Sequence, residues 1–137
     1  MTEKWLEYTR LYEGLRTMPY TCPVGHLTIG YGHNLENGIS QQAAEFILKE
    51  DLQIAQNMVQ KQFTGWKKLN EVRQFVLVDM AFNMGIHKLA TFKKMLAAVE
   101  EGNYTAAANE MLNSRWAVQV GRRARELAQM MEKGEYI

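Results

Sequence analysis

The chain of 137 residues is long enough to bury one hydrophobic core and too short for two independent domains. Its hydrophobic fraction of 47%, its charged fraction of 23% and its net charge of +1 are ordinary for a globular protein and give no broad field that would attract nucleic acid. The single cysteine cannot form an internal disulfide, and the N-terminal MTEKWLEYTR lacks the apolar region of a signal peptide. We therefore expect a protein made in the cytoplasm without a membrane span.

The first predicted elements are a helix and a small sheet. Apolar residues recur at three- and four-residue intervals over residues 5–15, which predicts an amphipathic helix that ends near Gly14. Over residues 19–38, prolines and glycines interrupt any helical pattern, while apolar and small residues alternate in LTIGYGH. This segment is predicted to form a hairpin or a small sheet.

The rest of the chain is predicted to be helical. Ser40 is a good N-cap for a long helix that runs to about Gln62. A second apolar helix follows and stops at Gly85. Further helices are expected over residues 91–101, 103–113 and 121–133. The predicted architecture is α+β and mostly helical: a helix, a small β region, a long helix and a bundle of four or five helices.

One carboxylate interrupts the apolar stripe of the long helix. Asp51 lies three residues after Leu48 and four before Ala55, and a buried carboxylate is costly unless it is paired. His33, at the end of the β region, is a candidate partner. The alternative is that the helix is rotated and Asp51 is solvated, and the pattern alone does not choose between the two.

Three residues of the N-terminal region form a candidate active site. Glu13 ends the predicted first helix, where free carbonyls disfavour negative charge, as suits a proton donor. Cys22 stands in a loop rich in proline and glycine, and Thr28 lies on the opposite side of its strand from Leu27 and Ile29. Taken alone, each residue has an ordinary structural explanation. Their joint spacing is what points to chemistry.

That spacing resembles the catalytic motif of phage-type lysozymes, the endolysins of glycoside hydrolase family 24. Glu13 is followed after eight residues by Cys22 and after five more by Thr28, and the family has Glu, then Asp or Cys, then Thr at these intervals. DMAFNMG at 79–85 is similar to the family's central buried helix. SRW at 114–116, followed by RRAR, is similar to its C-terminal segment. The resemblance spans nearly the whole chain.

The resemblance implies catalytic roles for the three residues. Glu13 matches the proton donor, Thr28 matches the threonine that orients water, and Cys22 takes the place usually filled by aspartate. A thiol is mostly neutral at neutral pH, whereas an aspartate is ionised. We expect Glu13 to raise the pKa of the Cys22 thiol further, unless Arg123 or the loop amides compensate. Cys22 could act as a base, as a nucleophile or only by shaping the water site.

The resemblance also implies supporting and substrate-binding residues. Arg123 matches an arginine that contacts the catalytic glutamate. His33 and Asp51 match a histidine–aspartate ion pair, which favours pairing over a solvated Asp51. With weaker identity, three positions match residues that contact the glycan in relatives: Gly32, Phe82 and Asn83.

The fold implied by the resemblance is a single lysozyme domain over residues 1–137. It has a small β lobe at about 14–39, a connecting helix at about 40–62, and a helical lobe at about 63–137 on which the N-terminal helix packs. Because the segment 34–40 is short, we expect a smaller β lobe than in longer relatives.

The implied activity is hydrolysis of the β-1,4 bond between N-acetylmuramic acid and N-acetylglucosamine in peptidoglycan. This reaction needs an acid at the leaving oxygen and a means to activate or position water. We expect no cofactor and no metal, since His26 and His87 lack ligand-like spacing. The expected partner is the glycan strand of peptidoglycan, without nucleic acid or membrane insertion. A monomer would wait in the host cytoplasm until a separate holin-type pore releases it to the periplasm.

Two other functions are weighed against hydrolysis. A lytic transglycosylase needs only one catalytic carboxyl and forms an anhydro-sugar without water, and the cysteine weakens the case for water activation. A non-catalytic peptidoglycan-binding or phage-structural module would be expected to have lost Glu13 or Thr28, and both are present. The basic stretch GRRARE is followed by glutamates and predicts a solvated helix face rather than a DNA-binding surface.

Overall fold

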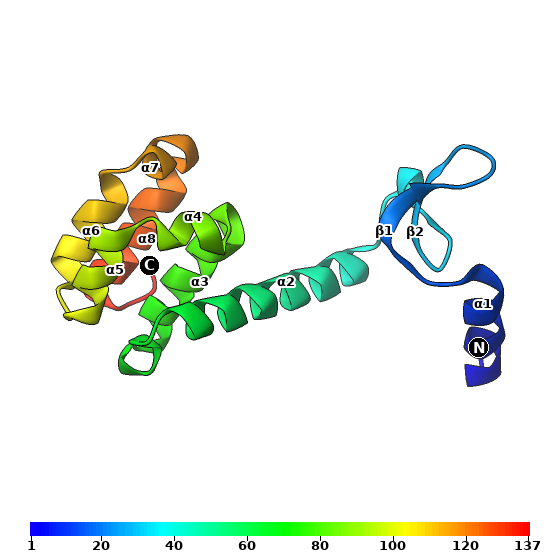
Figure 1. Ribbon diagram of the computed structural model, residues 1–137, viewed down its shortest axis with the longest axis horizontal. Coiled ribbons are helices and arrows are strands. Elements are labelled where there is room, and N and C mark those ends of the chain that lie inside the picture. Colours follow the sequence, from blue (N-terminus) through cyan, green and yellow to red (C-terminus); the bar gives the residue numbers. More distant parts are fainter. The chain divides into compact units, whose positions relative to one another are not determined.

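The computed structural model describes all 137 residues, which form eight α-helices, two short 3-10 helices and three strands (Figure 1). The chain divides into two compact units, Met1–Phe46 and Ile47–Ile137, and we describe each by itself. The long helix α2 (Gln41–Gln62) contains the boundary between them. The predominance of helix and the small antiparallel sheet confirm the predicted fold class. The single domain with the N-terminal helix packed on the helical lobe stays a prediction.

The N-terminal unit combines one helix with a small sheet. Its elements are α1 (Glu3–Glu13), β1 (Arg16–Thr21), β2 (Leu27–Gly30), β3 (His33–Asn34) and the 3-10 helix η1 (Leu35–Asn37). The strands are antiparallel in the order β1-β2-β3, so β2 is central. Helix α1 ends where predicted, because Gly14 takes a φ of +70° and its N–H closes the last turn on the Arg10 carbonyl.

Strand register places Thr28 in the middle of the sheet. Thr28 pairs with Tyr20 of β1 and with Asn34 of β3. It is 3% exposed and is the only buried polar or charged residue, whereas Leu27 beside it is exposed. Successive side chains of a strand point to opposite faces, so the predicted opposite orientation of Thr28 and Leu27 is confirmed.

Helix α2 begins as predicted, but less of its apolar stripe is buried than the pattern suggested. The Ser40 hydroxyl accepts a hydrogen bond from the Ala43 amide at 3.1 Å and caps the helix. Only Ala55 and Val59 of the predicted apolar stripe are buried, while Leu48 and its neighbours are exposed. The helical unit therefore covers only the C-terminal half of α2.

The helical unit is built around α3 (Glu71–Met84). This helix buries residues on several sides, namely Val72, Val76, Leu77, Val78, Met80 and Ala81. The other elements are the 3-10 helix η2 (Trp66–Lys68), α4 (Ile86–Ala90), α5 (Lys93–Glu100), α6 (Tyr104–Leu112), α7 (Arg115–Val120) and α8 (Arg122–Lys133). Helix α6 contacts both α5 and α8, and α8 packs on α3 (Figure 1). None of the helices has the length and apolar character that crossing a membrane would require.

The predicted helices are present, and two more accompany them. The segments predicted at 91–101, 103–113 and 121–133 correspond to α5, α6 and α8, and the apolar helix ending at Gly85 is α3. Helices α4 and α7 were not predicted, so the bundle has six helices after α2 rather than four or five. They span five and six residues, too few for a periodic pattern to be recognised.

Hydrogen bonds join the start of α3 to the end of α8. Asn70 accepts from the Arg73 amide at 3.0 Å, which caps α3, and donates to the Gly134 carbonyl at 2.9 Å. The Arg73 guanidinium donates to the carbonyls of Met131 and Glu132 at 2.8 and 2.9 Å. These carbonyls have no partner within their own helix, so Arg73 satisfies the C-terminus of α8 from outside.

Two adjacent methionines test how α8 packs into the core of the helical unit. Met131 is fully buried and Met130 is partly exposed. We expect Met131→Ala to lower the free energy of unfolding by about 2–5 kcal/mol, because it leaves a cavity in the core. Met130→Ala serves as the matched control and should cost about 1 kcal/mol or less. Urea denaturation measures both, and equal losses would contradict the burial of Met131.

Candidate active site

Cys22 occupies the first position of the tight turn that joins β1 to β2. The Gly25 amide donates to the Cys22 carbonyl at 2.8 Å, and the Cys22 amide donates to the His26 carbonyl at 2.9 Å. Pro23 suits the second position of such a turn, and Gly25 supplies the positive φ of +92° that the chain needs to rejoin the sheet. These two backbone hydrogen bonds and the strand register therefore fix the backbone of Cys22.

The turn also surrounds the sulfur with donors. The His26 amide donates to Cys22 Sγ at 3.4 Å. This hydrogen bond is the largest of the effects that lower the pKa of the Cys22 thiol, and partial burial opposes it. The Val24 amide, the Thr28 hydroxyl and the charge of His26 lower the pKa further. An increase due to Glu13 was expected unless Arg123 or the loop amides compensated, and the loop amides do so by stabilising the thiolate.

Thr28 is joined to Cys22 through the same turn. Its hydroxyl donates to the His26 carbonyl at 2.8 Å. The hydroxyl also lowers the pKa of the Cys22 thiol. Cys22 and Thr28 are thus joined through the backbone of His26, whose amide donates to the sulfur and whose carbonyl accepts from the hydroxyl.

Glu13 lies directly against Gly32 in the N-terminal unit. A Cβ added to Gly32 would come within 2.5 Å of Glu13 Oε2, so the carboxyl occupies the space that any other residue would fill. Gly32 also has a φ of +79°, which disfavours side chains. The structure therefore brings Gly32 together with Glu13, and the contact of Gly32 with the glycan stays a prediction.

His33 and Asp51 lie in different units. The Nε2 atom of His33 is 2.7 Å from the Gly38 carbonyl, which orients the ring within the N-terminal unit. Asp51 is exposed on α2, so within the helical unit it is solvated, which is one of the two alternatives that the pattern left open. The reason is that the helical unit covers α2 only from about Leu52 onwards. The His33–Asp51 ion pair stays a prediction, now between two exposed side chains.

Arg123 is held by a carboxylate that the sequence analysis missed. Asp79 accepts from Arg123 Nε and Nη2, both at 2.8 Å, and the Asp79 side chain is only 14% exposed. This two-point pairing fixes the plane of the guanidinium, and the hydrogen bonds raise the pKa of Arg123 above its usual range. Asp79 is the only carboxylate of α3 after its first residue, which is a signal the sequence offered. The contact between Arg123 and Glu13 stays a prediction.

Phe82 and Asn83 are presented at the exposed end of α3. Phe82 is 39% exposed and Asn83 beside it is also exposed, whereas Met80 and Ala81 just before them are buried. Asn83 Oδ1 accepts from the indole Nε1 of Trp116 at 2.8 Å, and Trp116 is buried. Because an indole can only donate, the Asn83 oxygen must face Trp116 and its amide nitrogen is free for another acceptor. Trp116 is thus a positioning residue for Asn83.

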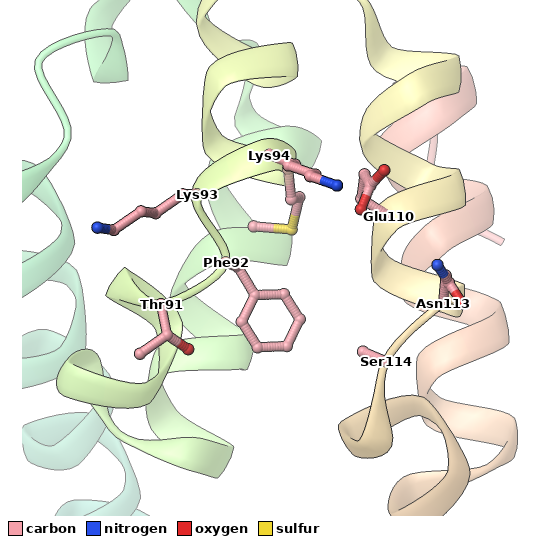
Figure 2. Close-up of a pocket in the computed structure, with 8 residues that line it drawn as sticks. Thr91, Phe92, Lys93, Lys94, Glu110, Asn113 and Ser114 are labelled. Carbon is pink, nitrogen blue, oxygen red and sulfur yellow. The ribbon is translucent and has the colours of Figure 1, made fainter.

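The helical unit also contains a pocket of about 380 Å³ between α5 and α6. Lys94 and Glu110 point toward one another across it, and Lys93 points away (Figure 2). Phe92, Met95, Asn113 and Ser114 complete most of its wall. The pocket offers both charges and an aromatic ring to a polar ligand, and none of the predicted site residues lines it.

Each unit therefore assembles part of the predicted site. Glu13 with Gly32, and Cys22 with Thr28, are placed by the helix, the turn and the sheet of the N-terminal unit. In the helical unit, Asp79 orients Arg123 and Trp116 orients Asn83, a residue of the predicted site. No group of three or more histidine, cysteine, aspartate or glutamate side chains is arranged to hold a metal ion.

Comparison with known proteins extends over nearly the whole chain. A family model described as phage lysozyme matches residues 10–133. The chain is 27% identical to "Probable T4-type lysozyme 1" of Dictyostelium discoideum over 152 aligned residues, which cover 89% of each protein. It is 30% identical over 116 residues to an endolysin of Acyrthosiphon pisum secondary endosymbiont phage 1, covering 82% of this chain and 77% of the endolysin.

A third relative is a much larger protein. The chain is 27% identical over 157 aligned residues to "Pre-baseplate central spike protein Gp5" of Enterobacteria phage T4, a match that covers 93% of this chain and 27% of the spike protein. The family model includes the positions of Glu13, Cys22, Thr28 and Arg123. Because that model matches most of the sequence, this chain belongs to the phage lysozyme family.

Proposed function

We propose that this chain is a muramidase of the glycoside hydrolase family 24 type, which hydrolyses the β-1,4 bond between N-acetylmuramic acid and N-acetylglucosamine. The observation that carries the proposal is the intact Glu13–Cys22–Thr28 motif, in which Cys22 and Thr28 both hydrogen-bond to the backbone of His26. Glu13 rests on Gly32, a position that also matches the family. Membership of the phage lysozyme family supports the assignment.

Hydrolysis of the glycosidic bond needs two proton transfers, one to the leaving oxygen and one from the attacking water. Glu13 protonates the glycosidic oxygen as the bond to the anomeric carbon breaks. A water attacks that carbon, and in the version where Cys22 is the base its thiolate takes a proton from this water. The resemblance assigns to Thr28 the orientation of this water, and the almost fully buried hydroxyl is held by the His26 carbonyl. Attack by Cys22 itself on the carbon is the nucleophilic alternative.

The biological role we propose is that of an endolysin. One relative carries that name, and it matches this chain over most of both sequences. The protein would act as a monomer on glycan strands in the periplasm, after a separate holin-type pore releases it from the host cytoplasm. The similarity to a phage spike protein keeps a phage-structural module as the second candidate. A module of that kind would not need the complete catalytic motif that this chain retains.

Lysis of outer-membrane-permeabilised Gram-negative cells tests the proposal. We expect the turbidity to fall, and Glu13→Gln to reduce the rate by ~10²- to 10⁴-fold, because the general acid is lost. Glu7→Gln on the same helix is the matched control and should lyse at the normal rate. The mass of the released fragments decides the reaction: hydrolysis adds one water, whereas a transglycosylase gives an anhydro-sugar. Normal lysis by folded Glu13→Gln would overturn the assignment.

A second pair of variants tests the contact between Glu13 and Gly32. In Gly32→Ala the new methyl group would collide with the Glu13 carboxyl and displace it, so activity should fall at least ~10-fold. Gly30→Ala is the control, because Gly30 also has a positive φ, of +71°, but a Cβ there meets no atom within 4 Å. Both variants should lose about 1–2 kcal/mol of stability through backbone strain. Equal activity of the two variants at matched stability would show that the contact between Glu13 and Gly32 does not matter for lysis.

Substitutions of Cys22 separate a chemical role from a packing role. We expect Cys22→Asp to stay active, because a carboxylate accepts the same loop amides and is ionised at neutral pH. A chemical role predicts a large loss of lysis in both Cys22→Ser and Cys22→Ala, since neither supplies a base or a strong nucleophile. A packing role predicts little loss in Cys22→Ser. Full activity of folded Cys22→Ala would show that the thiol is not needed.

A further inference from the structure

A histidine and a glutamate stand next to Cys22 without a role in the motif. His26 closes the turn, and its Nδ1 atom is 2.8 Å from Glu36 Oε2. Glu36 belongs to η1, whose first turn is held by the Asn34 side chain, which accepts from the Glu36 amide at 2.9 Å. The amide of the same His26 is the one that donates to Cys22 Sγ. The sheet and η1 therefore bring Cys22, His26 and Glu36 into one chain of contacts.

We propose that His26 and Glu36 are positioning residues that keep a positive charge beside the Cys22 sulfur and so increase the fraction of thiolate. The geometric basis is that the backbone of His26 is fixed to the sulfur, while its ring is fixed to a carboxylate. The thiolate fraction is a property of the free protein. Only its consequence for lysis rests on the proposed function.

The charges of this group act in one direction. The hydrogen bond to Glu36, and then its negative charge, raise the pKa of His26, so the ring keeps its proton to a higher pH than usual. The His26 amide has the largest effect on the pKa of the Cys22 thiol, and the charge of the imidazolium lowers that pKa by a smaller amount; the thiolate in turn slightly raises the pKa of His26. Within this group, the pKa of Cys22 depends on the charge of His26, and the pKa of His26 depends on the charges of Glu36 and Cys22.

The pH dependence follows from these signs. Below the raised pKa of His26 the ring is charged and favours the thiolate, and this help is lost as the pH rises through the titration of His26. The thiol should therefore titrate over a broader range than a single independent group. The side chains of His26 and Glu36 are 48% and 54% exposed, so their ion pair adds little to folding. Effects on the thiol are consequently separable from effects on stability.

Cys22 is the only cysteine, so its reaction with iodoacetamide reports its thiolate without interference. We expect His26→Gln to slow alkylation at neutral pH by roughly two- to fivefold at low ionic strength, with a smaller difference in high salt. Glu36→Gln should slow alkylation at neutral pH, because the His26 ring of the variant lacks the carboxylate that favours its protonated form. In mild acid the ring is charged in both proteins, so the variant should match the natural protein. His87→Gln is the control and should leave the rate unchanged.

Restoring the charge provides the complementary test. His26→Arg carries a permanent positive charge, so it should return the neutral-pH rate of alkylation to at least that of the natural protein. Equal rates for the natural protein and folded His26→Gln at every pH in low salt would overturn the proposal. So would a normal rate for Glu36→Gln at neutral pH.

Lysis then separates this inference from the proposed function. If Cys22 acts chemically, His26→Gln should slow lysis in parallel with alkylation, and the loss should shrink in a Cys22→Asp background, where the carboxylate is ionised without help. Slower alkylation with unchanged lysis would support the tuning of the thiol and count against a chemical role for Cys22. Unchanged alkylation alongside normal lysis would reject the tuning and leave the muramidase assignment standing.

Discussion

The turn at Cys22–His26 is the constraint on which the N-terminal unit depends. Two backbone hydrogen bonds close it, and they set the register that places Thr28 opposite Tyr20. They also leave two amides pointing at the side chain of the first turn residue. Aspartate at this position of a turn accepts the same kind of amide bond. The geometry thus explains why one backbone can accommodate either a carboxylate or a thiolate, since both are acceptors that the turn satisfies.

The helical unit solves a different problem, the placement of a strong positive charge. Asp79 binds Arg123 at two points and balances its charge, while the flat guanidinium keeps other N–H groups free. If Arg123 contacts Glu13 as the family resemblance implies, it would bring hydrogen-bond donors without a full uncompensated charge. A general acid must still release its proton to the substrate, so a balanced arginine suits that partner better than an isolated one. Trp116 plays the comparable part for Asn83, because its indole decides which atom of the amide is offered outward.

The elements that could be predicted from the sequence are those with a long pattern or a strong stop signal. Helices α2 and α3 have Ser40 and Gly85 as such signals, whereas α4 and α7 are too short for any period to emerge. The pattern could not decide whether Asp51 is buried, because periodicity reports which residues share a face, not how much of that face is covered. The direction of the Cys22 pKa shift was left open for a related reason, since spacing shows that Glu13 is near in sequence but not where the loop amides point. Asp79 was missed because a single carboxylate in an apolar helix has no local partner.

A thiol in place of a carboxylate changes what its neighbours must supply. An aspartate is ionised at neutral pH in almost any partly exposed setting, so amide donors only orient it. A thiol needs those donors to shift its ionisation, and a nearby imidazolium adds to the effect. The amides of the turn would serve both residues, but the pair of His26 and Glu36 has a purpose only for the thiol. A carboxylate at position 22 is ionised at neutral pH without help from a nearby positive charge. If the proposed tuning of the thiol holds, the residue at 22 and the pair of His26 and Glu36 are linked by the same electrostatic requirement.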